Sequence, residues 1–382
     1  MPHQQPSEFP GLLGLVSFVS RLAGTALLRA ITHPFHKRTA STYYKDVFFA
    51  VVRCSIGTMT IPQARYLLPN STQTYLKWCK SQKIEPRLVE IPAEGVNREG
   101  KVHMHWIGNP DTADVKILYF HGGAYTQYAT EGYYHYWTRW MREYNDRYQK
   151  VAVLMVAYSV APEHKYPTQL REVSAALSYL VDDLHVSPSD IIVSGDSAGG
   201  HLGLSLLTHL LHPHPEVAEV VIDKPLRGSL LISTWATMRT DFDSFTRNVD
   251  SDMVVPSVRR WAAMWLGQSN PKDPEKDPGP IVGDQYSDSL SNDPEWWEGL
   301  DSVVSDVFQW RGGDEMLVDP IAELDAKMIE GWVAGGGQKE RFVSIETPRH
   351  AHIAPIAGVM MDKEKCEAQL AVEEWLKARL RK

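Results

Sequence analysis

One stretch, IIVSGDSAGGHLGLSLL at 191–207, limits the fold of this chain more than any other. It starts as a short β-branched run, passes through Gly-Asp-Ser-Ala-Gly at 195–199, and continues as an apolar segment of helical length. The centre matches G-x-S-x-G, in which a tight turn from a strand into a helix strains the backbone at the serine. The flanking glycines leave room for neighbouring chain, and the helix N-terminus favours negative charge. We interpret Ser197 as a nucleophile, with an ordinary glycine-rich turn as the alternative.

Strand and helix patterns alternate through most of the chain. The run at 151–158 has no polar alternation, so we expect a strand buried on both faces. A helix is expected to follow, because six apolar residues share one face at helical spacing: Leu170, Val173, Leu177, Leu180, Val181 and Leu184. Further strands are expected at 87–91, 102–107, 116–120, 191–194, 227–233, 303–310 and 341–347. The alternation predicts an α/β fold with a mainly parallel central sheet flanked by helices.

Two segments depart from this alternation. Residues 1–80 show helical patterns, and 241–299 combine one or two helices with a Pro/Asp-rich loop. We expect residues 81–382 to form the main domain, with 241–299 as an insertion over the carboxyl edge of the sheet. We predict that the N-terminal helices join it as a cap. The apolar run at 11–20 is too short to span a bilayer and lacks a basic start, so we predict a buried or cap helix, with peripheral membrane contact as the alternative.

Composition excludes several functional classes. The 382 residues carry a net charge of −8 and no basic run, which argues against a nucleic-acid partner. Cys54, Cys79 and Cys366 have no metal-ligand spacing, so we expect no metal and a reducing, cytoplasmic compartment. The chain also has 12 Trp and 16 Tyr, several in tight groups, which favours a large apolar pocket.

A second glycine motif precedes the serine. The sequence HGGA at 121–124 follows the predicted strand at 116–120. Glycines at the end of a strand allow backbone N–H groups to point at a developing oxyanion. We expect the N–H groups of Gly122, Gly123 and Ala198 to form such an oxyanion hole, with a simple glycine turn as the alternative.

A nucleophilic serine also needs a base and an acid that orients the base. In α/β-hydrolases these follow in the order serine, acid, histidine. Asp314 and Glu315 lie after the predicted strand at 303–310, and His350 and His352 lie after the last predicted strand. From position alone, each role therefore has two neighbouring candidates.

Together these motifs resemble the hormone-sensitive-lipase-like (family IV) branch of the α/β-hydrolases. HGGA resembles the HGGG motif of that family, GDSAGG is its usual nucleophile elbow, and YSVAPEHKYP at 158–167 resembles its Y-R-L-A-P-E-H-x-F-P segment. The resemblance covers roughly residue 86 to the C-terminus. The WWEGL segment, the acid segment and HIAPI look most like fungal members, which include steryl-acetyl-hydrolase-like proteins and enzymes of natural-product pathways.

The resemblance implies a choice between the neighbouring candidates. Aligning LVD at 317–319 with the family pattern G-x-D-x-L-x-D puts Glu315 at the acid position, with Asp314 as the alternate. The H-x-A-P-I pattern favours His352 as the base, with His350 as the alternate. The chain departs from the family at Ala124, which replaces the third glycine, and at the residue after His352. Both departures affect the expected substrate more than the catalytic groups.

These expectations combine into a serine carboxylic-ester hydrolase without a cofactor. Its substrate would be a medium-sized apolar ester, for instance in fungal secondary metabolism. The pocket is expected to be lined by the helix at 11–31, the segment 261–266 and an aromatic cluster, claimed as a group and not residue by residue: Tyr125, Tyr128, Tyr133 and Tyr134. Two alternatives remain open: a biosynthetic enzyme that cyclises, transfers an acyl group or eliminates, and a non-catalytic ligand-binding protein. The oligomeric state is also open, and members of the family often form homodimers.

Overall fold

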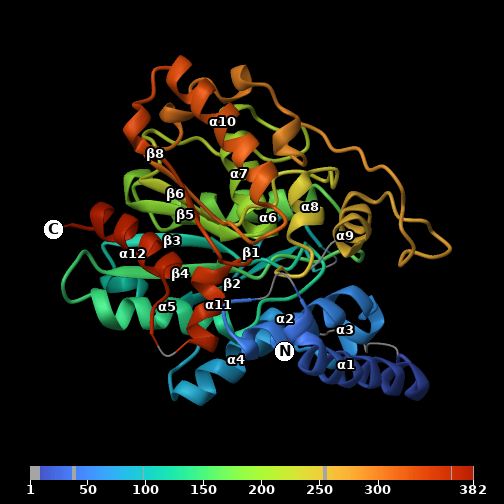
Figure 1. The fold of residues 1–382 in the computed structure, drawn as a ribbon. Helices are drawn as coiled ribbons and strands as arrows, with labels where there is room; N and C mark the ends of the chain where they lie inside the picture. The colour runs from blue at the N-terminus through green and yellow to red at the C-terminus, as the bar shows by residue number, and fades with distance from the viewer. Residues whose placement is uncertain (1–8, 37–39, 98, 253–255, 363, 382) are drawn as a thin grey trace.

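A central eight-stranded sheet organises the molecule (Figure 1). The computed structural model describes residues 9–36, 40–97, 99–252, 256–362 and 364–381. The strands are β1 (Leu88–Pro92), β2 (Lys101–Ile107), β3 (Val115–Phe120), β4 (Val151–Val156), β5 (Ile191–Asp196), β6 (Gly228–Ile232), β7 (Val307–Gly312) and β8 (Phe342–Thr347). Each lies within or overlaps a run that the sequence analysis assigned to a strand.

The order of the strands is β1-β2-β4-β3-β5-β6-β7-β8. Strand β2 is antiparallel to both of its neighbours, and the strands from β4 to β8 are parallel. All six residues of β4 are buried, which confirms the expectation for that unalternating run. The predicted mainly parallel α/β sheet is therefore confirmed.

Helices lie on both faces of the sheet and at one end of the molecule (Figure 1). They are α1 (Leu12–Thr32), α2 (Tyr43–Thr58), α3 (Ile61–Leu67), α4 (Ser71–Gln82), α5 (Glu131–Tyr144), α6 (Thr168–Ser178), α7 (Ala198–Leu211), α8 (Asp243–Arg247), α9 (Pro256–Leu266), α10 (Val318–Ala334), α11 (Ala354–Met361) and α12 (Glu367–Arg379). Helices α6, α7 and α10 pack on one face, and α5, α11 and α12 pack on the other (Figure 1).

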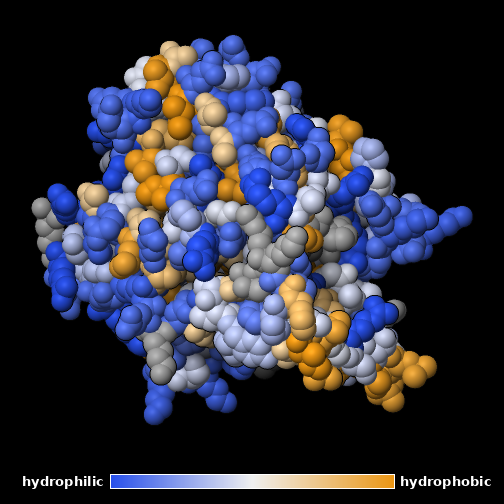
Figure 2. Space-filling model, viewed as in Figure 1, coloured by the Kyte–Doolittle hydropathy of each residue, from blue (hydrophilic) through white to orange (hydrophobic). Residues whose placement is uncertain are grey.

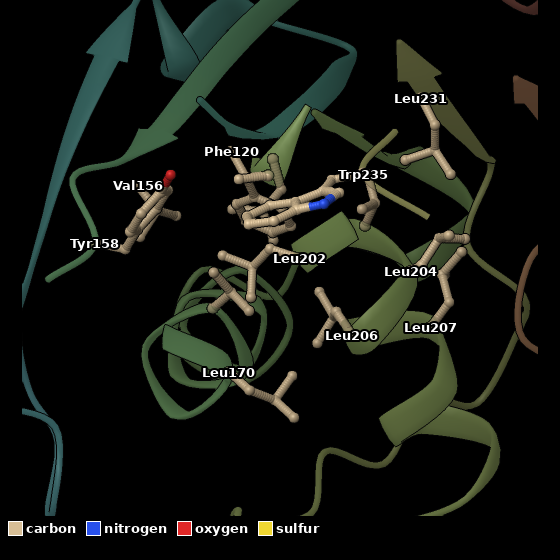
Figure 3. Close-up of a cluster of buried hydrophobic side chains, with 14 of the residues drawn as sticks. Phe120, Val156, Tyr158, Leu170, Leu202, Leu204, Leu206, Leu207, Leu231 and Trp235 are labelled. Atoms are coloured by element: carbon tan, nitrogen blue, oxygen red, sulfur yellow. The ribbon is translucent and has the colours of Figure 1, made fainter. Parts of the chain in front are cut away.

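Each face has its own apolar core. Figure 3 shows the core beside α6 and α7, where Phe120 of β3 and Trp235 lie next to Leu202 of α7. All three side chains are at most 2% exposed. Buried apolar area of this kind contributes roughly 25 cal/mol per Å² to folding. The core therefore fixes α7, and with it the turn that begins this helix, against the sheet.

The helix predicted around 170–184 ends earlier than its apolar pattern suggested. The α-helical part, α6, ends at Ser178, and a π-helical turn follows it over Tyr179–Asp183. Leu184 is 42% exposed, so its predicted place on the buried face is wrong. The wider π turn changes the residue spacing, and the positive φ of His185 (53°) then redirects the chain.

The N-terminal helices α1–α4 lie together at one end of the molecule (Figure 1). A buried ion pair joins α1 to α2: Arg29 Nε and Nη2 bond the two carboxylate oxygens of Asp46 at 2.7 and 2.8 Å. Phe18 and Arg29 are buried, whereas Leu13 is 86% exposed and Leu28 is 63% exposed. The expectation of a buried N-terminal helix is therefore wrong for most of α1. Most of its apolar side chains are exposed, because α2 packs against only one side of the helix.

Candidate active site

The turn between β5 and α7 holds Ser197 as the sequence predicted. The residue has φ 53° and ψ −120°, a strained conformation for a side-chain-bearing residue. Its N–H donates to the carbonyl of Ile232 at 2.9 Å, and its own carbonyl accepts from Trp235 N at 3.0 Å. A Cβ on Gly199 would meet the backbone of Phe120. Glycine is thus required for the close approach of this turn to β3.

The loops after β7 and β8 bring Glu315 and His352 together. Glu315 Oε2 lies 2.7 Å from His352 Nδ1. The other carboxylate oxygen, Oε1, accepts from Gly312 N at 2.7 Å and from Ser233 Oγ at 3.2 Å. Glu315 is fully buried and the His352 side chain is 13% exposed. The carboxylate therefore has a fixed orientation, and it directs the Nε2 atom of the imidazole away from itself.

Burial and charge set the titration of this pair. Burial raises the pKa of Glu315, while the hydrogen bond and charge of His352 oppose the rise. Burial would lower the pKa of His352, but the hydrogen bond to Glu315 and the charges of Glu315, Asp252 and Asp196 outweigh it, so this pKa is raised. Asp196 directly precedes Ser197, and its own pKa also responds to the charge of His352. The imidazole therefore lies within electrostatic reach of the nucleophile turn.

The alternate candidates lie beside this pair in a different arrangement. The backbone N–H of Asp314 donates to the carbonyl of His350 at 3.0 Å. His350 Nδ1 lies 2.9 Å from the carbonyl oxygen of Pro348. Both side chains line a cavity of 280 Å³ that also reaches His352. The structure therefore pairs Glu315 with His352, and His350 with the carbonyl of Pro348 and the thiol of Cys366.

The HGGA loop at 121–124 differs from expectation at one residue. The N–H of Gly122 donates to Asp196 Oδ1 at 2.9 Å, so the prediction that it is a free donor is wrong. Gly123 has φ 119° and Ala124 has φ 50°. Within the described residues, the N–H groups of Gly123, Ala124 and Ala198 donate to no other group. Three N–H groups are thus available near the serine, with Ala124 in place of Gly122.

Asp196 anchors this loop. Its carboxylate accepts from Tyr119 Oη at 2.6 Å and Tyr133 Oη at 3.1 Å, in addition to Gly122 N. Burial raises the pKa of Asp196 to about 6, although these hydrogen bonds oppose the rise. The middle residue of G-D-S therefore connects the HGGA loop to the turn at Ser197. Sequence reasoning missed this role, and the only signal was an acidic side chain beside the serine.

Ser233 is a second residue that the motifs did not reveal. It follows β6 with φ 51°, donates to Glu315 Oε1 and accepts from Ile353 N at 2.9 Å. One hydroxyl thus connects the acid to the residue after His352. No sequence pattern marked this serine, because its role depends on strands brought together only by the sheet.

The aromatic residues expected to line one pocket pack against different neighbours. Tyr134 is fully buried against Trp78, with 5.3 Å between ring centroids, so its assignment to the pocket is wrong. Tyr125 is also fully buried, stacks on Trp265 at 4.0 Å, and places its Oη 2.6 Å from His201 Nδ1. Tyr128 is half-buried beneath the guanidinium of Arg65 at 4.8 Å.

The predicted N-terminal part of the pocket lining is also wrong for much of α1. Its exposed apolar side chains include Leu12, Leu13, Val16, Val19, Leu27, Leu28 and Ile31. These side chains face outward and cannot line an internal pocket in this conformation. Trp265 of α9, in contrast, does reach the oxyanion loop through its stack on Tyr125. The insertion therefore contacts the residue that follows HGGA, and Lys45 and Phe49 of α2 line the cavity that reaches His352.

Comparison with known proteins agrees with this geometry. A family model described as "alpha/beta hydrolase fold" matches residues 117–292. The chain therefore has the α/β-hydrolase fold. The match and the relatives support the resemblance of its HGGA, GDSAGG and YSVAPEHKYP segments to the hormone-sensitive-lipase-like branch.

Curated relatives include an arylacetamide deacetylase of Bos taurus, 33% identical over 160 residues, which are 38% of this chain and 36% of the relative. Steryl acetyl hydrolase 1 of Saccharomyces cerevisiae is 26% identical over 220 residues, which are 55% of this chain and 47% of the relative. Across the first three relatives the match spans between 23% and 56% of their own length.

Solved structures share the whole fold. A hormone-sensitive lipase from a metagenome library has a TM-score of 0.59 and 17% identity, with 90% of this chain and 99% of that chain covered. An esterase from the bacterial hormone-sensitive lipase family has a TM-score of 0.56 and 21% identity, with 95% and 98% covered. At this level of identity the likeness concerns the fold alone.

Proposed function

We propose that this protein is a serine carboxylic-ester hydrolase with Ser197 as nucleophile, His352 as general base and Glu315 as the orienting acid. The observation that carries the proposal is the 2.7 Å contact between Glu315 Oε2 and His352 Nδ1. It joins two loops at the same sheet edge as the strained serine. A buried carboxylate on Nδ1 keeps the proton there, so that Nε2 can accept the serine proton.

The reaction follows from these groups. Ser197 Oγ attacks the acyl carbonyl as His352 Nε2 takes its proton, and the imidazolium then protonates the leaving alcohol. Water attacks the acyl-enzyme with His352 again as base, which releases the acid and restores the serine. The N–H groups of Gly123, Ala124 and Ala198 would stabilise the oxyanion in both steps. Loss of one such donor typically costs about 100- to 1000-fold in rate.

For the substrate we propose a small acyl group on a larger apolar alcohol. The names of the bovine and yeast relatives both specify removal of an acetyl group. The aromatic stack of Tyr125 and Trp265 lies directly after the oxyanion loop and is fully packed, which favours a short acyl chain. An apolar ester of fungal secondary metabolism fits this class. Cyclisation or acyl transfer would require that an internal nucleophile replace water.

The first experiment measures initial rates on p-nitrophenyl acetate, butyrate and octanoate. We expect the highest kcat/KM for acetate and the loss of turnover in Ser197→Ala. Thermal unfolding of both proteins serves as the control for folding. A wild-type protein that is folded yet as inactive as the variant on all three esters would overturn the esterase proposal and favour a ligand-binding role.

We also propose that α1 rests on a membrane surface. By length and composition alone, the helix over Leu12–Phe35 is long and apolar enough to cross a bilayer, so the expectation drawn from the shorter run at 11–20 is wrong. Only 11% of its apolar window is buried. Figure 2 shows hydrophobic side chains gathered at the end of the molecule where α1 lies. The buried pair Arg29–Asp46 holds α1 along α2, which favours a helix lying in the interface over one that spans it. Access to apolar esters from a lipid surface would suit the proposed reaction.

Flotation with neutral phosphatidylcholine vesicles tests this contact. We expect the wild type to float and the double variant Leu13→Ser, Leu28→Ser to remain in solution, because full burial of one leucine stabilises by roughly 1.5–3 kcal/mol. Val221→Ser, Val282→Ser is the matched control, since both valines are at least 75% exposed elsewhere. Equal behaviour of all three proteins would contradict the proposal. A dimer abolished by the leucine changes would identify a second copy as the occupant.

The cytoplasmic assignment is part of the same proposal. Cys54, Cys79 and Cys366 are free, which fits a reducing compartment.

A further inference from the structure

The acid loop is bound by a segment of the insertion that no motif highlighted. Side chains between 244 and 252 bond the backbone of 313–316 at several consecutive residues. Asn248 Nδ2 donates to the carbonyls of Glu315 at 2.8 Å and Gly313 at 3.2 Å. Ser251 Oγ donates to the carbonyl of Asp314 at 3.0 Å. The insertion therefore fixes the loop that carries the proposed acid.

Asp252 connects this loop to the histidine loop. Its Oδ2 accepts from Met316 N at 2.7 Å, and its Oδ1 accepts from His352 N at 3.2 Å. Met316 directly follows Glu315. Asp252 therefore binds one backbone N–H on the loop of the proposed acid and one, that of His352, on the loop of the proposed base. Asp252 is 3% exposed. A carboxylate buried to this extent costs free energy unless its hydrogen bonds are specific, which favours a role in the site.

We propose that Asp252 is a positioning residue of the active site, which holds the acid and histidine loops in register and places a second negative charge beside His352. The inference rests on the proposed function of Ser197, His352 and Glu315. Asp252 does not touch the substrate in this scheme. It acts through the backbone of His352 and through the field at the imidazole.

The electrostatic surroundings of His352 agree with this role. The charged groups that act on it are Glu315 on the acid loop, Asp252 on the insertion and Asp196 at the end of β5. Each of these carboxylates raises the pKa of His352, against the lowering effect of burial. Asp252 also raises the pKa of Glu315. Removal of the Asp252 charge should therefore make His352 easier to deprotonate.

Asp252 also receives support from the N-terminal helices. Arg53 Nη1 of α2 donates to the carbonyl of Asp252 at 2.9 Å. The contact connects α2, against which α1 packs, with the loops of the site. Asp250, two residues earlier, is 50% exposed and bonds neither loop, so it provides a matched control.

The test compares Asp252→Asn, Asp252→Glu and Asp250→Asn by kcat, KM and the pH profile of kcat/KM. In D252N we expect kcat to fall roughly 10- to 100-fold with KM little changed, because misplaced catalytic groups lower the rate of chemistry. The acid limb should move down by about one pH unit, because one carboxylate near the imidazole is lost. D252E should lose kcat but keep the acid limb in place. D250N should behave as wild type.

A merely structural role would lower kcat in D252N without moving the acid limb, and this result would overturn the inference. An NMR titration of His352, assigned with His352→Gln, gives the pKa in wild type and D252N without any substrate. An inactive wild type would therefore refute the esterase proposal alone, while an unchanged His352 pKa would refute the role of Asp252. Should D252N fail to fold, Asp252→Ser, which keeps an acceptor without charge, replaces it.

Discussion

The change Glu315→Gln separates the proposed acid from its neighbour Asp314. Glutamine keeps the length of the side chain, and its amide oxygen can still accept from Gly312 N. Its amide N–H would point at His352 Nδ1, which lies 2.7 Å from the carboxylate in the wild type. The imidazole would then carry its proton on Nε2. In that tautomer it cannot accept the proton of Ser197.

The expected loss is large because nothing can replace the carboxylate. Glu315 is fully buried, so no water molecule can replace its contact with His352. Loss of the correct tautomer in a Ser-His-acid triad lowers kcat by about 10⁴-fold. This corresponds to about 5.4 kcal/mol of activation free energy. Thermal stability should change little, because a buried charge is exchanged for a neutral group of the same shape.

The assay measures kcat and KM on p-nitrophenyl acetate at pH 8, with thermal unfolding as the control for folding. Asp314→Asn, one residue away, should retain activity within about threefold, equivalent to about 0.7 kcal/mol. The reasoning is refuted if D314N loses activity and E315Q keeps it. It is also refuted if both variants are as active as wild type.

Other outcomes follow from the same structure. Gly199→Ala should destabilise the fold by at least about 3 kcal/mol in urea unfolding, since its Cβ would meet the backbone of β3. Asp46→Asn should cost about 2 kcal/mol at pH 7, because the buried Arg29 and other hydrogen bonds lower the pKa of Asp46 from 3.8 to about 2 against the opposing effect of burial. In wild type this contribution is complete above pH 3.8 and is lost as the pH falls through about 2, so acid unfolding of D46N should lack it. The acid limb of kcat/KM should lie above pH 6.5, because the raised pKa of His352 keeps the base protonated until the pH exceeds it.

The strand-turn-helix around Ser197 was predictable because local pattern determines it. The β-branched run, the glycines and the apolar helix are consecutive in sequence, and each constrains the backbone by itself. The parallel strands were predictable for the same reason. The sequence order of serine, acid and histidine also pointed to the two loops that the structure joins through Glu315 and His352.

Contacts between different loops could not be predicted from the sequence. HGGA predicts a glycine-rich loop with oxyanion donors, but which N–H groups are free depends on Asp196, which binds Gly122. The choice between Asp314 and Glu315 depends on how the loop turns after β7, and only the family resemblance favoured Glu315. The exposure of α1 could not be predicted from its composition, because an apolar helix can have the same hydropathy whether its apolar face is buried in the protein or exposed.

The central claim is that Ser197 is an activated nucleophile, and covalent capture tests it most directly. A fluorophosphonate reacts with such a serine by forming an Oγ–P bond and releasing fluoride. Mass spectrometry of the wild type should show one adduct, located on Ser197 and formed far more slowly in His352→Gln. A folded protein that gains no adduct, or gains it on another residue, would contradict the account.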